Sequence, residues 1–391
     1  MKKILLAVLA LTLISASFAV AEEINEEDSA PVHNIERIEI IDSNTNGTGV
    51  VVDSMRVTVN ITAERRNDVY AHLYGEASSN RKSTIPKLVM DKSGRNLQII
   101  LDSGKGTKLF YMRKGEVTLD VRIPENFDRE LFVRFSSARI FAENIACDTI
   151  GIRTSSGDMN LKELASDSLD LHASSGDIDV SVFEGRNAAI HTSSGRITAE
   201  ELNGDEGEIT SISGDIRIGS LFGNFTIKAS SGDIRVEESE GTMSADASSG
   251  SVRFLDARGR YKAESSSGDI EFNFNGNEGY LDAHASSGSV EVEELNGSVD
   301  LFSTSGNIEA VLTELKDDCR IKASSGDISI ELPKKSDFFV DAKTSSGRIK
   351  IDFPVTVQGD IDKDEIQGSV GSGDHELYLR SSSGDINIQQ K

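Results

Sequence analysis

The chain has 391 residues, with 34 Gly, 5 Pro and no Trp, and a formal net charge of −24 at pH 7. A surface this acidic repels nucleic acid and anionic lipid, which argues against both as partners. Runs of Val, Ile and Phe that are cut by Ser, Asn and Asp favour an all-β fold.

The first segment has the form of a signal peptide. Lys2 and Lys3 precede an apolar run, and Ala19-Val20-Ala21 forms a small-residue cleavage motif before Glu22. We therefore expect residues 1–21 to be removed on export, which leaves a mature chain without a transmembrane segment. Such a protein would be periplasmic, exposed on the cell surface or secreted.

Two non-repeating regions follow. Residues 22–36 predict an acidic leader, with strands beginning near Arg37, and residues 37–125 predict an N-terminal β cap. Within the cap, the segment "KLVMDKSGRNLQIILDS" predicts a hairpin that turns at Ser93-Gly94. Because these segments lack the period found further along, we expect an antiparallel cap that shields the open end of the repeat.

Residues 126–391 contain a repeat whose most regular phrase is "SSGD". Apart from the last copy, its glycines are spaced by 18 to 21 residues, at Gly157, Gly176, Gly195, Gly214, Gly232, Gly250, Gly268, Gly288, Gly306, Gly326, Gly347 and Gly384. A degenerate copy with Ala138 in the glycine position precedes them. A fixed period in this range predicts a solenoid, here a single-stranded parallel β-solenoid of about 13 coils.

The residues around each glycine predict the faces of the coil. The second residue after every glycine is Ile, Val or Met, from Met159 to Ile386, which predicts a buried ladder. The third residue before it is always Ala, Ser or Thr, as a tight corner requires. We expect the glycine to supply a positive φ, and Ser and Asp to bond turn amides. The longer gap before Gly384 predicts an irregular loop near residues 354–365, and the edge of the final coil needs a cover.

Several repeated side chains are candidates for sites. Aspartates directly after the glycine could share calcium, although turn chemistry is the simpler interpretation; they are Asp158, Asp177, Asp215, Asp233, Asp269, Asp327 and Asp385. His172 and His191 hold the same position in successive coils, but a third metal ligand is not evident, and exposed strand residues are the simpler interpretation. Arg217, Arg235 and Arg253 form a possible binding row beside a row of glutamates, or else a solvated face. Cys319 falls in an inward column and is expected to be buried without a disulfide partner.

The repeated "SSGDI" units, the lead-in "VRIPENFDRELFVRFSSARIF" and the ending "GSVGSGDHELYLRSSSGDINI" carry a family resemblance. On these residues the sequence resembles a bacterial family described as putative adhesins, a domain of unknown function built of β-strand repeats. The resemblance covers about residues 37 to 391. It implies a β-repeat fold and adhesion, and it supplies no catalytic residues.

The sequence therefore predicts an exported, non-enzymatic binding module at the cell envelope, acting by multivalent surface contacts. We expect no catalytic residues, no cofactor and no metal, and a partner that is a glycan, a matrix or envelope component, or a second copy of the chain. A periplasmic scaffold that assembles with itself through the end of the solenoid is the alternative. A carbohydrate-active enzyme is disfavoured, because short coils without Trp or a separate carboxylate cluster lack a catalytic cleft.

Overall fold

The structure is a computed structural model that describes residues 20–43, 50–79, 84–102, 110–357 and 363–391. These residues form strands and turns without an α-helix, and they belong to two compact units that divide between Leu164 and Ala165. The expected signal peptide lies outside the described residues except for its last two positions. In the described part of the chain, no helix is long and apolar enough to span a membrane.

The first unit combines antiparallel and parallel strands. Its strands are β1 (Val20–Pro31), β2 (Arg37–Asp42), β3 (Val50–Glu64), β4 (Asp68–Ser79), β5 (Lys87–Ser93), β6 (Asn96–Asp102), β7 (Phe110–Pro124), β8 (Glu130–Phe135), β9 (Arg139–Ala146) and β10 (Thr149–Thr154). Antiparallel pairing joins β1 to β4, β4 to β7 and β5 to β6, so the predicted hairpin at Ser93-Gly94 is confirmed. In contrast, β2 runs parallel to β6 and β8, and β3 runs parallel to β7 and β9. The cap is thus only partly antiparallel, because coil-like parallel stacking already begins at β2 and β3.

The acidic leader is the first correction. Strands begin at Val20 and not near Arg37, because residues 20–31 form β1, which pairs along its whole length with β4 from Val20–Ser79 to Pro31–Asp68. Among residues 21–31, whose burial the structure describes, Ile24 is the one buried apolar residue, with 5 % of its surface exposed. Main-chain hydrogen bonds to β4 therefore keep β1 in place, although the side chains of β1 do not predict a strand.

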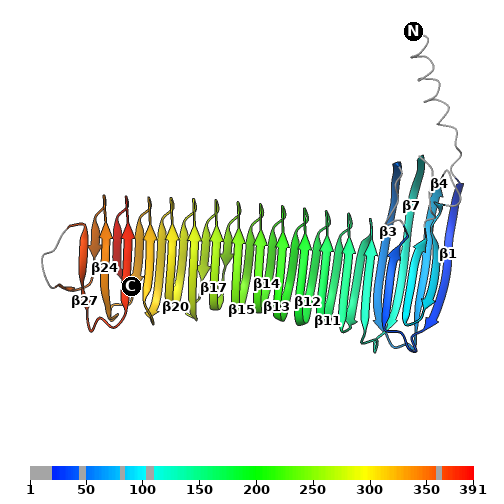
Figure 1. Cartoon of the computed structure of the whole chain (residues 1–391), viewed down its shortest axis with the longest axis horizontal. Helices are drawn as coiled ribbons and strands as arrows, with labels where there is room; N and C mark the ends of the chain where they lie inside the picture. Colours follow the sequence, from blue (N-terminus) through cyan, green and yellow to red (C-terminus); the bar gives the residue numbers. More distant parts are fainter. Residues whose placement is uncertain (1–19, 44–49, 80–83, 103–109, 358–362) are drawn as a thin grey trace, which may run out of the picture. The chain divides into compact units, whose positions relative to one another are not determined.

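The second unit is a stack of parallel coils. Strand β11 (Met159–Ala173) contains the division between the units, and the strands that follow are β12 (Ile178–Thr192), β13 (Ile197–Ser211), β14 (Ile216–Ala229), β15 (Ile234–Ala247), β16 (Val252–Phe254), β17 (Ala257–Ser265), β18 (Ile270–Asn273), β19 (Glu278–Ala285), β20 (Val290–Ser303), β21 (Ile308–Leu315), β22 (Cys319–Ala323), β23 (Ile328–Leu332), β24 (Phe338–Thr344), β25 (Ile349–Ile351), β26 (Thr356–Val357), β27 (Glu365–Val370), β28 (Glu376–Ser381) and β29 (Ile386–Gln390). From β12 to β15 the strands lie side by side and run in the same direction (Figure 1). Ile178, Ile197 and Ile216 lie in register and are fully buried, which confirms the predicted apolar ladder. The parallel β-solenoid is confirmed, with about 11 turns instead of 13.

The corner glycines lie where the sequence places them, but the expected reason for glycine is wrong. None of the twelve has the positive φ that was predicted, and all of them are among the described residues. Instead the coils approach too closely for a side chain, since a Cβ on Gly195 would lie 1.9 Å from the carbonyl oxygen of Gly176. The same contact recurs along the stack, for example at 2.0 Å between Gly250 and Gly232. Positive φ occurs instead at a second corner of the coil, nine residues before the corner glycine, as at Gly223 and Gly241.

Side chains of the "SSGD" phrase bond one coil to the next. The hydroxyl of Thr192 accepts the N–H of Gly195 in its own coil and donates to the carbonyl oxygen of Gly176 in the coil before, both at 3.1 Å. Ser211, Ser265, Ser303, Thr344 and Ser381 repeat this pattern. The corner thus satisfies backbone groups that no strand pairing reaches.

The last coil of the chain is not the last coil of the stack. Strands β28 and β29 pair in parallel with β22 and β23 on one side and with β24 and β25 on the other. In Figure 1 the red terminal strand accordingly has strands in orange shades on both sides. The antiparallel strands β26 and β27 then cover β24, and the part of the predicted loop at residues 358–362 lies outside the described residues. The edge of the final coil therefore needs no other molecule to cover it.

Candidate ligand groove

A groove of about 720 Å³ runs along one lateral face of the second unit. One wall is a single register line, formed by Asn187, Glu206, Asn224, Thr242, Arg260 and Tyr280. With roughly 4.8 Å between neighbouring coils, these six positions extend over about 24 Å. A second line on the other side of the inward column contributes Ala189, Thr226, Ser244, Lys262 and Asp282.

Residues of unequal size at one inward position form the floor of the groove. This column contains Ala188 and Gly207, and then the larger Phe225, Met243 and Tyr261. A Cβ on Gly207 would lie 2.2 Å from the Phe225 ring, so glycine is needed there to leave room for the ring. The surface is hollow where small residues replace large ones in an otherwise regular stack.

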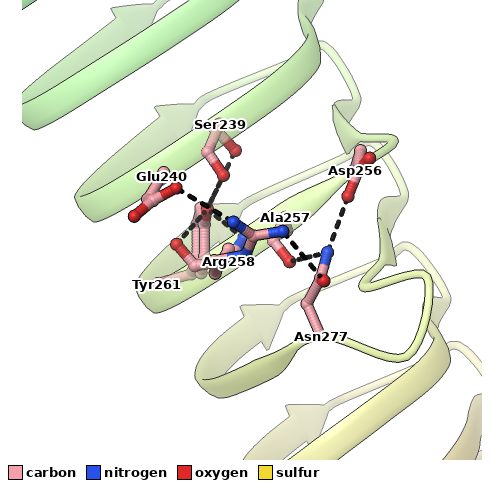
Figure 2. A network of polar contacts seen from close by, with 7 residues as sticks. All are labelled: Ser239, Glu240, Asp256, Ala257, Arg258, Tyr261 and Asn277. Carbon is pink, nitrogen blue, oxygen red and sulfur yellow. Dashed lines mark hydrogen bonds and ion pairs between the residues drawn. The ribbon is translucent and has the colours of Figure 1, made fainter.

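Tyr261, at the floor of the groove, is held by a polar network at the second corner (Figure 2). Its hydroxyl lies 2.8 Å from the Ser239 hydroxyl and accepts the N–H of Arg258 at 2.9 Å. The Arg258 guanidinium donates to Glu240 and to Asn277, each at 3.2 Å, and Asn277 donates to Asp256 at 2.7 Å. Burial raises the pKa of Tyr261 to about 12, so the hydroxyl stays protonated, and it donates within the network to the carbonyl oxygen of Ser239 at 3.0 Å.

The lining offers hydrogen-bonding groups of mixed charge and one aromatic face. Asn224, Thr242 and Ser244 contribute an amide and two hydroxyls in the middle of the groove. Arg260 lies over the half-buried ring of Tyr280, with the guanidinium carbon 4.6 Å from the ring centroid. Lys262 is engaged by Glu264 at 2.7 Å. Such a lining suits a long, hydroxyl-rich molecule better than a compact ion.

The arginine row is contiguous, yet each of its cations is paired. Arg217, Arg235 and Arg253 are direct neighbours in register. Their carboxylate partners are Asp215 at 2.8 Å, Glu237 at 2.6 Å and Glu271 at 2.6 Å, in that order. An anionic ligand on this row would have to compete with those carboxylates, which weakens it as a binding surface.

The row continues into the predicted row of glutamates. Glu271, Glu291 and Glu309 are neighbours in register. The pKa of Glu291 is raised, first by burial and then by the surrounding glutamates. The shift reflects the cost of keeping a carboxylate charged beside other carboxylates.

The aspartates directly after the corner glycines accept hydrogen bonds from backbone N–H groups. The Oδ1 atom of Asp233 accepts the N–H of Ser251 at 2.8 Å, and Asp327 accepts the N–H of Asp385 at 2.7 Å. These carboxylates thus accept hydrogen bonds from the corner of the next coil, in keeping with the turn interpretation.

His172 and His191 stack with ring centroids 4.9 Å apart. The pKa of His191 is lowered, first by burial and then by the charge of His172.

One group of three potential metal ligands occurs within the described ranges. It consists of Asp317, Asp318 and His375, whose ligand atoms lie within 4.8 Å of one another. The Asp318 carboxylate accepts the N–H of Glu376, and the Asp317 carboxylate accepts that of Asp318, both at 2.8 Å. These bonds give the two carboxylates a structural role at the entry to β28.

Both cysteines are buried and free, as predicted for Cys319. Burial raises the pKa of each thiol to about 12. A protonated, buried thiol neither binds metal nor attacks a substrate readily.

The groove was not predicted from the sequence. A usable signal exists eight residues before the corner glycine, where Asn187, Asn224 and Thr242 are uncharged polar residues. The small inward residues Ala188 and Gly207 complete that signal.

The coils, their in-register rows and the lateral groove define a β-solenoid repeat protein. The chain belongs to the Toastrack DUF4097 family, whose model matches residues 48–274, 220–294 and 280–389. This confirms the resemblance carried by the "SSGDI" units, a domain of unknown function within a family of putative adhesins. No curated protein matches the chain.

Three crystal structures are similar to this chain. A "putative cell adhesion protein" from Clostridium sporogenes is 9 % identical, with a TM-score of 0.22, and the match covers 95 % of this chain and 100 % of that one. A "putative adhesin" from Parabacteroides merdae is 13 % identical, with a TM-score of 0.32 and coverage of 68 % and 95 %. A "putative adhesin" from Bacteroides fragilis is 11 % identical, with a TM-score of 0.23 and coverage of 94 % and 98 %.

Proposed function

We propose that the protein is an exported, non-enzymatic binding module that holds an extended, hydroxyl-rich polymer along the lateral groove. The observation that carries this proposal is the groove itself, in which six neighbouring coils present side chains at one register position. Family membership supports a non-enzymatic role and an adhesin-like function. A glycan is the ligand class with the matching chemistry, since amides, hydroxyls and an aromatic face are what recognise sugar hydroxyls and ring faces.

The mechanism is multivalent. Each coil supplies one or two hydrogen-bonding side chains at a fixed spacing, and a net hydrogen bond is worth only about 0.5–1.5 kcal/mol. Contacts along one polymer chain add up, because the first contact raises the effective concentration of the next site. A rigid stack of coils makes this addition efficient, since little side-chain order has to be created on binding.

Blocking the middle of the groove tests the proposal. Thr242→Arg places a long side chain at an exposed position between Asn224 and Arg260. Thr198→Arg, on the outward row of Arg217, is the matched control with the same change of charge. Against a panel of immobilised polysaccharides and matrix proteins, Thr242→Arg should weaken binding at least tenfold and Thr198→Arg should not. Equal binding by both variants would contradict the assignment of the groove.

The arginine row is a second surface to test. Reversal of Arg217, Arg235 and Arg253 to Glu should weaken binding less than Thr242→Arg, because each arginine already has a carboxylate partner. Stronger loss from the reversal would move the binding surface to that row. Release of reducing or unsaturated ends from any polysaccharide of the panel would contradict the non-enzymatic role.

The structure offers no support for the end-to-end docking that the scaffold alternative assumes. Docking of copies through residues 381–391 requires an exposed final coil, and this segment lies between two other coils. Export to the cell surface is supported by the signal-like first segment. Protease treatment of intact cells tests it: digestion of the chain is expected, and protection until the envelope is opened would favour a periplasmic role.

A further inference from the structure

A small cationic pocket lies between the coils at the C-terminal end of the second unit. It has a volume of about 260 Å³, and its lining contains Lys322, Arg380 and Lys343 but no carboxylate residue. The protein as a whole has a formal net charge of −24, with 65 acidic residues against 41 Lys and Arg. Three cations lining one pocket are therefore a local excess of positive charge on an otherwise acidic protein.

The three cations are neighbours because the terminal coil is inserted. Lys322 on β22 and Lys343 on β24 each lie in register with Arg380 on β28. Without β28 between them, Lys322 and Lys343 would not flank a third cation. With roughly 4.8 Å between neighbouring strands, the three cations form one short row, and all three line the same pocket.

Ion pairing leaves one of these charges uncompensated. Lys343 pairs with Glu365 at 2.6 Å, and Arg380 pairs with Asp341 at 2.7 Å. For Lys322, the described residues provide no carboxylate within ion-pair distance, and its Nζ atom lies over the Tyr378 ring, 5.5 Å from the centroid. Three positive and two negative charges leave a net charge of 3 − 2 = +1, which Lys322 carries.

The remaining lining can donate hydrogen bonds. Ser324, Ser345 and Ser382 line the pocket, and their backbone N–H groups are already bonded to neighbouring coils. Their hydroxyls make no hydrogen bond to another described residue and are free to donate to a ligand. Phe302 forms the remaining apolar side of the pocket.

We propose that this pocket binds a sulfate or phosphate group, with Lys322 as the main cation and the three serine hydroxyls as additional donors. An oxyanion with three or four acceptor oxygens matches one ammonium and several hydroxyls better than a planar carboxylate does. Phe302 would contact the carbon skeleton of an esterified group. The site is independent of the groove and does not rest on the function proposed above.

The experiment is a calorimetric titration with sodium sulfate, sodium phosphate and sodium acetate at constant ionic strength. Lys322→Gln should weaken sulfate or phosphate binding at least tenfold, the equivalent of about 1.4 kcal/mol. Lys228→Gln, which also removes an outward lysine charge but lines neither the groove nor this pocket, should leave binding unchanged. Thr242→Arg should leave it unchanged too, so that failure of the groove and failure of this pocket can be told apart.

Two polymers then identify the source of the group. Heparin represents sulfate esters and polyphosphate represents phosphate, and binding that is lost in Lys322→Gln but kept in Lys228→Gln would assign the polymer class. Binding of the inorganic ions alone, with the same dependence on Lys322, would assign a site for the free anion. The proposal is overturned if the unmodified protein binds neither sulfate nor phosphate at millimolar concentration, if acetate binds as well as both, or if Lys322→Gln binds like Lys228→Gln. Unchanged thermal unfolding of Lys322→Gln would confirm that the variant is folded.

Discussion

The corner glycines provide the sharpest test of how the coils stack. In Gly250→Ala, the new Cβ would lie 2.0 Å from the carbonyl oxygen of Gly232, whereas unstrained contacts need about 3.5 Å. The coils would have to separate locally, at the expense of the bonds from Ile234 N–H to the Ser251 carbonyl at 2.9 Å and from Ser251 N–H to Asp233 at 2.8 Å. Two lost bonds at about 1 kcal/mol each and an overpacking term of about 1–3 kcal/mol give a destabilisation of about 3–5 kcal/mol.

A second glycine separates crowding from backbone conformation. Gly276 has a φ of +79° and no atom within 4 Å of a Cβ, so substitution there meets only backbone strain. Asn tolerates the left-handed region better than Ala, so Gly276→Asn should be more stable than Gly276→Ala. At position 250 the larger Asn should be no better than Ala, because crowding is the limit there.

Thermal unfolding followed by circular dichroism measures both pairs, since the chain has no Trp to serve as a fluorescent probe. A loss of about 3–5 kcal/mol should lower the midpoint of Gly250→Ala by about 6–20 °C. The stacking argument is refuted if Gly250→Ala unfolds within about 2 °C of the unmodified protein, or if Gly250→Asn recovers stability as Gly276→Asn does.

Four further outcomes follow from the described contacts. Ser265→Ala removes the hydrogen bonds to the Gly268 N–H at 2.9 Å and to the Gly250 carbonyl oxygen at 3.1 Å. The substitution should lower the free energy of unfolding, measured by denaturant titration, by about 1–2 kcal/mol. No change would mean that water replaces both bonds. The pKa of Tyr261 rises from 10.0 to about 12 on folding, so the unfolded chain releases this proton first as the pH is raised. The free energy of unfolding should therefore fall as pH rises between those two values, and it should fall less steeply in Tyr261→Phe. Equal slopes in the two proteins would contradict the assignment. Burial raises the pKa of Cys147 and of Cys319 to about 12. Both thiols should therefore resist a thiol reagent at pH 8 in the native protein and react with it after unfolding. Rapid labelling of either thiol in the native protein would place that thiol at the surface. Deletion of residues 376–391 removes an internal coil, so limited proteolysis should cut β24 to β27 early, and a protease-resistant truncated chain would contradict the inserted order.

Local periodicity explains the part of the fold that the sequence could predict. The apolar residue two positions after the glycine and the small residue three positions before it depend only on the alternation of one strand, so Ile178 and Thr192 were assigned correctly. The hairpin at Ser93-Gly94 is equally local. The period of the corner glycines likewise identifies the solenoid, although it cannot reveal that a carbonyl oxygen of the preceding coil occupies the space of the missing Cβ.

Features that depend on which coils are neighbours could not be predicted in the same way. Strand β1 has few buried side chains, and its pairing with β4 depends on main-chain groups that every sequence possesses. The arginine row was placed correctly, but the carboxylates at Asp215 and Glu237 that neutralise it depend on side-chain direction. The groove arises from differences in residue size between coils, as at Gly207 and Phe225, rather than from any one motif.

The order of the coils follows from the same physics that makes them alike. Because each coil presents nearly the same inward column to its neighbour, the apolar ladder alone does not specify which coil lies next to which. Specificity at the C-terminal end comes from elements that break the repeat: β27 pairs antiparallel with β24 of the outermost coil, and β26 pairs antiparallel with β27. Insertion pairs both edges of β28 and β29 with other coils, whereas a terminal coil would expose one row of backbone groups. It also places Arg380 between Lys322 and Lys343, so the arrangement that removes a free edge is the one that creates the cationic pocket.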